Sequence, residues 1–385
     1  MKKRSAFTRA TARAAVALGT AATLAAGTVA ACAAAVPASS AVASPLSRLT
    51  PLQLAGQRVI YSYTGLTPPA SLLSRISHGE AAGVIFFGDN ISSEAQISGV
   101  IKTLEAADAS RDNPVRAPLL LMTDQEGGEV RRLPGAPVKS EKQIGEAAHP
   151  GAAAAAAGSG AGANLLGVGM NVNLAPVLDV YRKAGDFDDQ FQRSYSKNPR
   201  VVSRLGADFI RAQQKAGVAA TAKHFPGLGA ATAAEDTDTG PVTLNLPAAT
   251  IRGVDELPYR AAIAAGVRLV MVSWAVYPSL DPKRPAGLSA IIVGGGLRAR
   301  LGFTGVTITD ALEAGALRAF GSFGHRAVLA AGAGMDLILC ANGSTAEGTA
   351  AMNGLRAAYN DGALRQAAFR AAVTRIIALR RALPA

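Results

Sequence analysis

Cysteine, histidine and tryptophan are scarce in this sequence, and the scarcity of cysteine argues against a disulfide framework. It contains two cysteines, four histidines and one tryptophan in 385 residues. Cys32 lies in a segment that we expect to be processed, and Cys340 ends an apolar run and is expected in the core. No disulfide within the chain is therefore expected, and stability must come from packing. No block of Lys and Arg with interleaved aromatic residues is present, which leaves a role in nucleic-acid binding without support.

The first 31 residues have the pattern of an export signal. Five Lys and Arg residues without an acid precede residues 14–31, which are small, apolar or Thr. A spanning helix is the alternative, but large apolar side chains are few. Residues 29–32 fit lipoprotein processing, in which Cys32 becomes the lipidated first residue; simple cleavage after Ala43 is the other outcome. We expect an exported, lipid-anchored protein. Its formal net charge falls from +12 to +7 when the signal is removed, so attraction to an anionic cell surface stays open.

The rest of the chain predicts a tether followed by one α/β domain. Residues 32–50, rich in Ala, Ser, Pro and Val, are predicted to be flexible, and no linker-like break divides residues 51–385. Apolar runs typical of strands alternate with stretches of helical spacing, which include 92–109, 198–216, 254–266 and 315–332. The predicted strands are 58–63, 83–88, 119–124, 170–180, 218–224, 268–274, 305–310 and 335–340. Eight repeats predict a single closed (β/α)8 TIM barrel.

An open doubly wound sheet is the rival architecture. It would need a Gly-rich phosphate-binding turn after an early strand, and Gly127 with Gly128 is too short to be one. Residues 151–163, almost all Ala and Gly, are either low-complexity sequence or a helix packed closely on the barrel, and we expect the helix. Residues 362–383 place apolar side chains at helical spacing with Arg on the other face, which predicts a closing amphipathic helix.

Charged residues end three of the predicted strands. Asp124 ends the third, Lys223 and His224 end the fifth, and Asp310 ends the seventh. Taken singly, an acidic residue at such a position could equally cap the next helix. In a barrel, however, the carboxyl ends of all strands meet on one face. Together these residues predict a site on that face.

Five stretches of the domain together resemble a known family. The run KHFPGLG (223–229) precedes a polar loop to residue 240 that carries three acidic residues and that we expect to move. The other four are MTDQEGGEVRRL (122–133), NVNLAPVLDV (171–180), LGFTGVTITDALEAGAL (301–317) and AGAGMDLIL (331–339). Each is weak alone, but together they resemble the bacterial β-N-acetylhexosaminidases of glycoside hydrolase family 3 over nearly the whole exported domain. The resemblance implies a single-domain TIM barrel.

The resemblance also implies roles for single residues. Asp310 takes the position of the aspartate that attacks the anomeric carbon. The positions that hold the sugar beside the scissile bond are taken by Asp124, Arg132, Arg193, Lys223 and His224. A carboxylate accepts hydrogen bonds from neighbouring hydroxyls, while Arg, Lys and His donate to ring substituents. Asp179 takes a position that organises the rim. Without the resemblance, Arg193 would be assigned to the surface.

The sequence departs from the family pattern at the acid/base. The flexible loop of the family carries Asp, a small residue and then the His that acts as acid/base, whereas this chain has Asp236, Thr237 and Asp238. We predict that Asp238 is the acid/base, with Asp236 as the alternative, because neighbouring carboxylates raise the pKa of a carboxyl. The remaining histidines are expected on solvated loops or helices: His78, His149 and His325.

Three other positions depart from the family. Glu129 replaces a common Arg, and Leu228 replaces a His. Trp274 stands where relatives often have His. It either stacks on the sugar or belongs to the core, and we expect stacking.

Two functions of different classes follow. The first is a monomeric retaining exo-β-N-acetylglucosaminidase, needing no cofactor or metal, that acts on cell-wall (peptidoglycan) glycan fragments or muropeptides. Related β-glucosidases and xylosidases typically add a second α/β domain that supplies the acid, which we do not expect here. The second is a sugar-binding cell-wall lipoprotein of the same fold with impaired catalysis. A binder does not need Asp310, so we favour the enzyme. The natural aglycone, a requirement for an attached peptide, and water or phosphate as the acceptor stay open.

Overall fold

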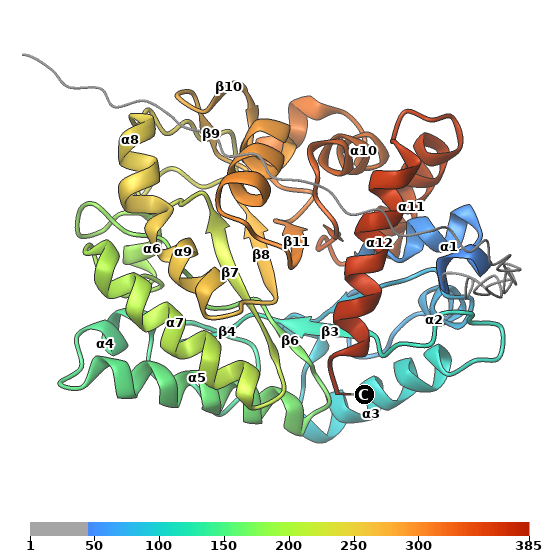
Figure 1. The fold of residues 1–385 in the computed structure, drawn as a ribbon. Coiled ribbons are helices and arrows are strands. Elements are labelled where there is room, and N and C mark those ends of the chain that lie inside the picture. Colours follow the sequence, from blue (N-terminus) through green and yellow to red (C-terminus); the bar gives the residue numbers. More distant parts are fainter. Residues whose placement is uncertain (1–44, 385) are drawn as a thin grey trace, which may run out of the picture. The chain divides into compact units, whose positions relative to one another are not determined.

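Eight parallel strands form a closed sheet in the computed structural model, which describes residues 45–384 (Figure 1). The strand order is β11-β8-β7-β6-β3-β2-β1-β12. Closure comes from the pairing of β12 with β1 and from a bridge between Ile308 in β11 and Leu337 beside β12. The strands are β1 (Val59–Tyr61), β2 (Gly83–Ile85), β3 (Leu120–Thr123), β6 (Val172–Asn173), β7 (Ala219–Phe225), β8 (Leu269–Val272), β11 (Val306–Thr309) and β12 (Ile338–Leu339). The prediction of a single (β/α)8 barrel is confirmed, and the open sheet is excluded.

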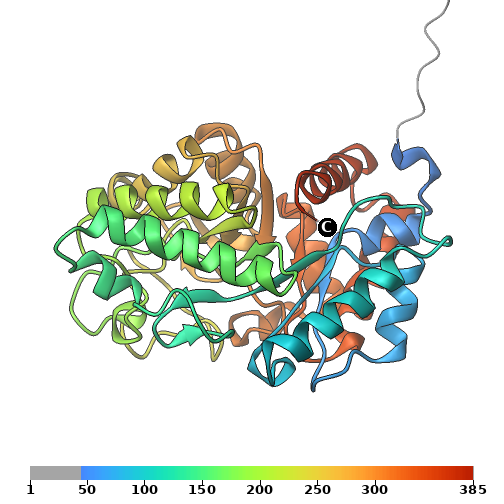
Figure 2. The same cartoon turned by 90° about the horizontal axis from the view of Figure 1, so that it is seen from below.

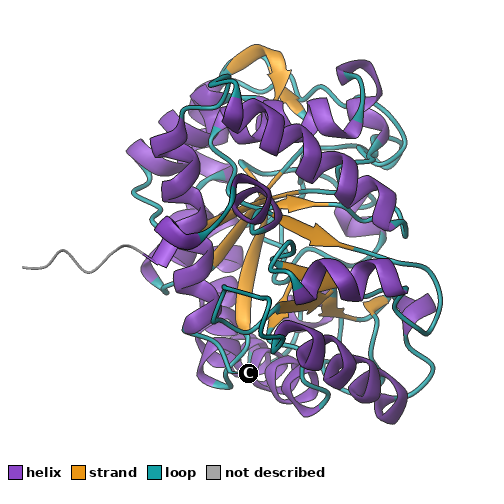
Figure 3. Ribbon diagram, turned by 90° about the vertical axis from the view of Figure 1, so that its right-hand side faces the viewer, coloured by secondary structure: helices purple, strands orange, loops and turns teal. Residues whose placement is uncertain are grey.

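Helices cover the outside of these strands (Figure 3). The α-helices are α1 (Pro51–Gly56), α2 (Ala70–Ser77), α3 (Glu94–Asp108), α4 (Glu141–Gly145), α5 (Pro150–Gly167), α6 (Phe187–Gln190), α7 (Pro199–Lys215), α8 (Ala248–Thr250), α9 (Leu257–Ala264), α10 (Phe323–Ala333), α11 (Thr345–Asn360) and α12 (Gln366–Arg381). The 3-10 and π segments are η1 (Pro45–Arg48), η2 (Gly88–Asn90), η3 (Ile251–Asp255), η4 (Ala286–Leu288), η5 (Ile291–Arg300) and η6 (Gly315–Phe320). Two antiparallel ribbons, β4 (Gln125–Gly127) with β5 (Val130–Arg131) and β9 (Val276–Tyr277) with β10 (Asp281–Pro285), lie outside the barrel sheet.

Two predicted elements differ from the structure in extent. The fourth strand was expected over residues 170–180, but regular pairing in β6 stops at Asn173, and Pro176 has no N–H to continue a ladder. The helical stretch 315–332 divides into η6 and α10. The division falls at Ser322, whose side chain accepts a hydrogen bond from the backbone N–H of His325 and so starts a new helix.

The barrel interior is packed with apolar side chains from alternate strand positions. Ile60, Leu120, Met122, Val172, Leu269, Met271, Ile308 and Leu337 belong to one buried cluster. Ile376 and Leu379 of α12 join this cluster, and Arg380 of α12 donates to the carbonyls of Ala117 and Pro118, just before β3 begins. The predicted C-terminal helix therefore closes the N-terminal end of the barrel.

The Ala- and Gly-rich segment forms α5, which runs alongside α7 (Figure 2). The approach depends on a missing side chain, because a Cβ at Gly158 would lie 2.3 Å from the carbonyl oxygen of Phe209. The expectation of a closely packed helix is confirmed.

Packing begins inside the segment predicted as a tether. η1 places Leu46 in the main core cluster together with Leu49, and Thr50 caps α1. The predicted signal segment, residues 1–31, and the lipidation position Cys32 lie outside the described residues. Within residues 45–384, no helix is long and apolar enough to cross a membrane.

Candidate active site

A cavity of about 220 Å³ lies at the carboxyl ends of the barrel strands. All eight residues predicted for catalysis or sugar binding within the described chain line it: Asp124, Arg132, Arg193, Lys223, His224, Asp236, Asp238 and Asp310. They come from the ends of β3, β7 and β11 and from three loops. The floor is apolar and consists of barrel-core side chains, namely Ile85, Leu174, Met271 and Leu339. The cavity therefore ends blindly inside the barrel.

Glu126 binds two of the three Arg and Lys side chains that line this cavity. Its carboxylate lies 2.7 Å from Nζ of Lys223 and accepts two hydrogen bonds from Arg193, at 2.8 and 2.9 Å. Lys223 also donates to Asp124 at 2.6 Å. Burial alone would raise the pKa of Glu126, but the charges of Arg193 and Lys223 outweigh it and lower the pKa to about 2. We did not assign Glu126 a role from the sequence, although it lies in the acidic motif.

The β4–β5 hairpin positions Glu126 and Arg132. Gly127 and Gly128 form the turn with φ of +113° and +58°, and a Cβ at Gly127 would lie 2.3 Å from the carbonyl oxygen of Lys139. The backbone N–H of Arg132 donates to the side chain of Gln125 at 3.0 Å. Nε of Arg132 is buried and has no hydrogen-bond partner among residues 45–384. The Arg132 side chain is one of those that line the cavity.

Asp179 orients His224 from behind. Its carboxylate accepts from Nδ1 of His224 at 2.7 Å and from the backbone N–H of Leu228 at 2.5 Å. Asp179 is fully buried and does not line the cavity, as expected of a residue that organises the rim. Burial lowers the pKa of His224, which favours the neutral ring. A neutral ring that donates through Nδ1 presents Nε2 as a hydrogen-bond acceptor.

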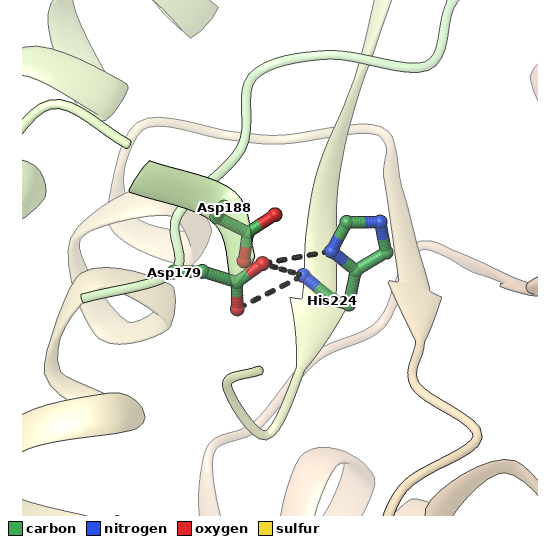
Figure 4. Close-up of side chains that lie close together, drawn as sticks. All are labelled: Asp179, Asp188 and His224. Carbon is green, nitrogen blue, oxygen red and sulfur yellow. Dashed lines mark hydrogen bonds and ion pairs between the residues drawn. The ribbon is translucent and has the colours of Figure 1, made fainter. Parts of the chain in front are cut away.

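Asp188, from α6, completes a buried cluster with Asp179 and His224 (Figure 4). One ligand-type atom from each residue lies within 4.8 Å of the others, and two carboxylates with an imidazole form a donor set that Zn²⁺ accepts. In the structure, Nδ1 of His224 is instead hydrogen-bonded to Asp179. Burial raises the pKa of Asp179 to about 6 and, with the charge of Asp179, that of Asp188 to about 7. The cluster therefore holds protons readily.

Asp310 stands one residue beyond β11. Its Oδ1 accepts from the backbone N–H of Ala311 at 2.8 Å. Burial raises the pKa of Asp310, His224 opposes this shift, and Asp238 adds to it. Asp310 and Asp238 are therefore close enough to influence each other's ionisation.

The loop that carries Asp238 is fastened to the segment after Asp310. The carbonyl of Asp238 accepts from the N–H of Gly315 at 2.8 Å, and that of Thr237 accepts from the N–H of Ala316 at 3.0 Å. Burial raises the pKa of Asp238, and the charge of Asp236 raises it further, in the direction predicted. The carboxylate of Glu235 instead accepts from Thr232 and does not line the cavity.

The expectation for Trp274 is wrong. Its ring is fully buried, packs over Gly287 and does not line the cavity, because the residues around β9 and β10 cover it. Its indole N–H donates to the carbonyl of Ala311 at 2.8 Å, so it supports the segment that carries Asp310. Leu228 lines the cavity, and Glu129 is exposed. Cys340 is buried, and His78, His149 and His325 are exposed, as expected.

A barrel that gathers carboxylates and cationic donors in one cavity at its C-terminal face has the arrangement of a glycoside hydrolase. Residues 56–379 match the glycosyl hydrolase family 3 N terminal domain. The chain belongs to this family, and it is a glycoside hydrolase.

Individual relatives extend this comparison. The chain is 46% identical over 331 residues to an uncharacterized secreted glycosyl hydrolase of Arthroderma benhamiae, covering 86% of this chain and 93% of the relative. It is 33% identical to a beta-hexosaminidase of Xanthomonas oryzae, in a match that covers 73% of this chain and 83% of the relative. Among solved structures, a family 3 beta-N-acetylglucosaminidase from Paenibacillus superposes with a TM-score of 0.81 at 36% identity, covering 87% of this chain but 62% of that one. The structure of a beta-N-acetylhexosaminidase from Beutenbergia cavernae superposes with a TM-score of 0.78 at 31% sequence identity. The match covers 86% of this chain and 98% of that one.

Proposed function

We propose that the protein is a retaining exo-β-N-acetylglucosaminidase that releases terminal N-acetylglucosamine from cell-wall glycan fragments. The observation that carries the proposal is the blind cavity in which Asp310, Asp238 and the five predicted sugar-binding residues meet. A blind cavity accepts the end of a glycan rather than its middle. Relatives named for action on N-acetylhexosamine support the choice of sugar.

In the proposed reaction, Asp310 attacks the anomeric carbon while the bond to the leaving oxygen breaks. Asp238, protonated, donates its proton to that oxygen. The resulting glycosyl ester on Asp310 is then attacked by water, whose proton returns to Asp238. The raised pKa of Asp238 suits it to the acid step, because the group must hold its proton before the bond breaks.

The charged pairs of the cavity give the sugar its binding partners. Asp124 accepts from Lys223 and has further lone pairs for neighbouring hydroxyls. Arg132 lines the cavity and carries guanidinium donors for ring substituents. Since Glu126 holds both Arg193 and Lys223, the donors are in place before the sugar arrives, which lowers the cost of binding.

Turnover of an aryl N-acetyl-β-glucosaminide tests the proposal directly, with the matching aryl β-glucoside as the control for the acetamido group. We expect release of the aryl alcohol from the first substrate, an initial product of unchanged β configuration by NMR, and water rather than phosphate as the acceptor. Faster cleavage of the glucoside, or an α product, would contradict the proposal. Muropeptides with and without a peptide then define the natural aglycone.

The second candidate is a sugar-binding protein with impaired catalysis. The observation that favours it is Asp238 at the position where the family pattern described above implies the His that acts as acid/base. Calorimetric binding of N-acetylglucosamine oligomers without any release of sugar would support it. Turnover of the aryl substrate would exclude it.

We also propose that the enzyme is exported and anchored by a lipid on Cys32. The basic start, the apolar run and residues 29–32 motivate this proposal, and one relative is described as secreted. The mature protein is expected to begin at Cys32 and to partition with membranes, and Cys32→Ala is expected to release it or leave it unprocessed. A mature N-terminus at Ser44 would contradict the anchor. Export would place the enzyme beside cell-wall glycan.

A further inference from the structure

Asp188 is a fully buried carboxyl with no part in the reaction above. Its Oδ1 accepts one long hydrogen bond from Nη1 of Arg193, at 3.3 Å, while Oδ2 is buried and has no hydrogen-bond partner within residues 45–384. Figure 4 shows the carboxyl of Asp188 beside that of Asp179. A buried carboxylate oxygen without a donor is costly, so its environment requires an explanation.

The surrounding charges provide that explanation. The groups that face Asp188 are Asp179 after β6, Arg193 after α6, His224 in β7 and Glu126 in β4. Arg193 is already occupied by Glu126 through two shorter bonds, so it neutralises Asp188 poorly. Two adjacent buried carboxylates cannot both ionise cheaply, whereas a proton between them forms a strong hydrogen bond. A hydrogen bond from Asp188 to Asp179 is consistent with the positions of the two groups.

We propose that Asp188 is a positioning residue whose carboxyl O–H donates a hydrogen bond to Asp179 and thereby fixes the ring of His224 and the guanidinium of Arg193 against the sugar. The proposal rests on the proposed function for the identity of the ligand. The carboxylate of Asp179 accepts from the backbone N–H and Nδ1 of His224 and from the backbone N–H of Leu228, so a bond from Asp188 would act on the His224 ring through Asp179. The proton on Asp188 therefore connects α6, through Asp179, to His224, and Asp188 itself contacts Arg193.

A pair of substitutions separates this role from an ordinary ion pair. Asp188→Asn keeps the shape, and its amide donates to Asp179 as the protonated acid does. Asp188→Ala removes the donor. We expect Asn to keep kcat/KM within a few fold of the wild type, and Ala to lower it roughly 10- to 100-fold, the scale of a small misplacement of binding groups. If Asn is as impaired as Ala, Asp188 acts as a charge and the proposal fails; if Ala equals the wild type, it also fails.

The pH profile supplies a readout that a merely structural role would not change. The pKa of Asp188 is raised to about 7, so kcat/KM of the wild type is expected to fall as pH rises through that value, when the donated proton is lost. Asp188→Asn cannot lose this proton, so the part of the alkaline fall that comes from Asp188 should disappear and only the part set by the acid Asp238 should remain. An unchanged alkaline limb in Asp188→Asn would overturn the proposal.

Asp189 on the same helix provides the matched control. Its carboxylate pairs with Lys142 at 2.8 Å and does not line the cavity. Asp189→Asn and Asp189→Ala are expected to keep the alkaline limb and to resemble each other. The Nδ1–H resonance of His224 in the free protein tests the proposal without any substrate. It should be protected from exchange in wild type and Asp188→Asn and lost in Asp188→Ala, even if the protein cleaves no N-acetylglucosaminide. Equal protection in all three would overturn the proposal.

Discussion

The N-terminal end of the barrel buries charges that are all bonded within the protein. Asp336 accepts from Arg298 at 2.5 Å and from Arg375 at 2.7 Å. Arg58 donates to the backbone carbonyl of Asp336 at 3.0 Å and stacks over the ring of Phe369. None of these four charged side chains has a buried polar atom without a partner. This end therefore uses its charges to join α12 and η5 to the sheet.

The C-terminal end is built differently. Carboxylates outnumber cations around the cavity, and both Arg132 and Asp188 keep a buried polar atom without a partner. Glu126 holds Arg193 and Lys223, and both of these cations line the cavity. Buried charge alone therefore does not mark a binding site in this barrel. Incomplete satisfaction of buried charge does not mark it alone either, because Glu141 and Glu347 also have a buried oxygen without a hydrogen-bond partner among the described residues and do not line the cavity.

Asp310→Asn should give the largest effect. It removes the charge of the proposed nucleophile with little change of volume, so turnover should fall by orders of magnitude, on the scale of the ~10⁶-fold loss that follows removal of an enzyme nucleophile. The free energy of unfolding should change little, because Asp310 bonds only to the backbone of Ala311. Mass spectrometry after trapping with a 2-fluoro sugar should find the label on Asp310, and a label on another carboxylate would contradict the assignment.

Asp238→Ala should lower the rate of turnover less for substrates with an activated leaving group than for natural substrates. Loss of the acid should hardly slow an activated dinitrophenyl glycoside but should slow a natural disaccharide by orders of magnitude, roughly 10²- to 10⁴-fold for one proton-transfer group. Azide should restore turnover as the glycosyl azide. Asp236→Ala is the comparison variant. If Asp238→Ala instead lost equal activity on both substrates, and Asp236→Ala showed the dependence on the leaving group, the acid/base role would belong to Asp236.

Asp336→Asn should reverse the pattern of Asp310→Asn. It removes the buried partner of Arg298 and Arg375, whose side chains are 19% and 34% exposed, so the free energy of unfolding should fall by at most about 3–5 kcal/mol. Because Asp336 lies at the opposite end of the barrel from the cavity, kcat/KM of the folded fraction should stay unchanged. Urea unfolding and initial rates at a low temperature measure the two quantities. A large loss of kcat/KM without a loss of stability would break the distinction between the two ends.

The pH dependence of stability should show the smallest effect. The pKa of Glu126 falls from 4.5 to about 2 on folding, so its contribution is present above 4.5 and is lost as pH falls toward 2. The pKa values of Asp188 and Asp255 rise from 3.8 to about 7, so the folded state holds protons that the unfolded state has lost, and stability falls as pH rises through this window. Urea unfolding should give a maximum near about pH 4 to 5. If stability falls less steeply with rising pH in Asp188→Asn, part of the fall comes from Asp188. If the fall is unchanged, it comes from other groups.

Much of the candidate site was predictable because it lies at strand ends. Asp124, Lys223 and Asp310 follow apolar runs, and parallel strands bring such ends to one face. Arg193 was identified only through the family resemblance, since nothing local distinguishes it from a surface residue. Its partner Glu126 lies 67 residues away, and no periodicity connects the two. Trp274 was misassigned because the pattern of a strand does not show which layer will cover its end.

By itself, the sequence determined the barrel and part of the contents of its cavity, since eight apolar runs, three of them ending in site residues, allow few other arrangements. The tertiary structure decided which charges are satisfied by the protein and which are left for a ligand. Glu126 became the anchor of two cations, Asp188 came to lie against Asp179, and Asp238 was tied to the segment after Asp310. These outcomes depend on contacts between residues far apart in the chain, and the ionisation of each group depends on its burial and on the charges that folding places beside it.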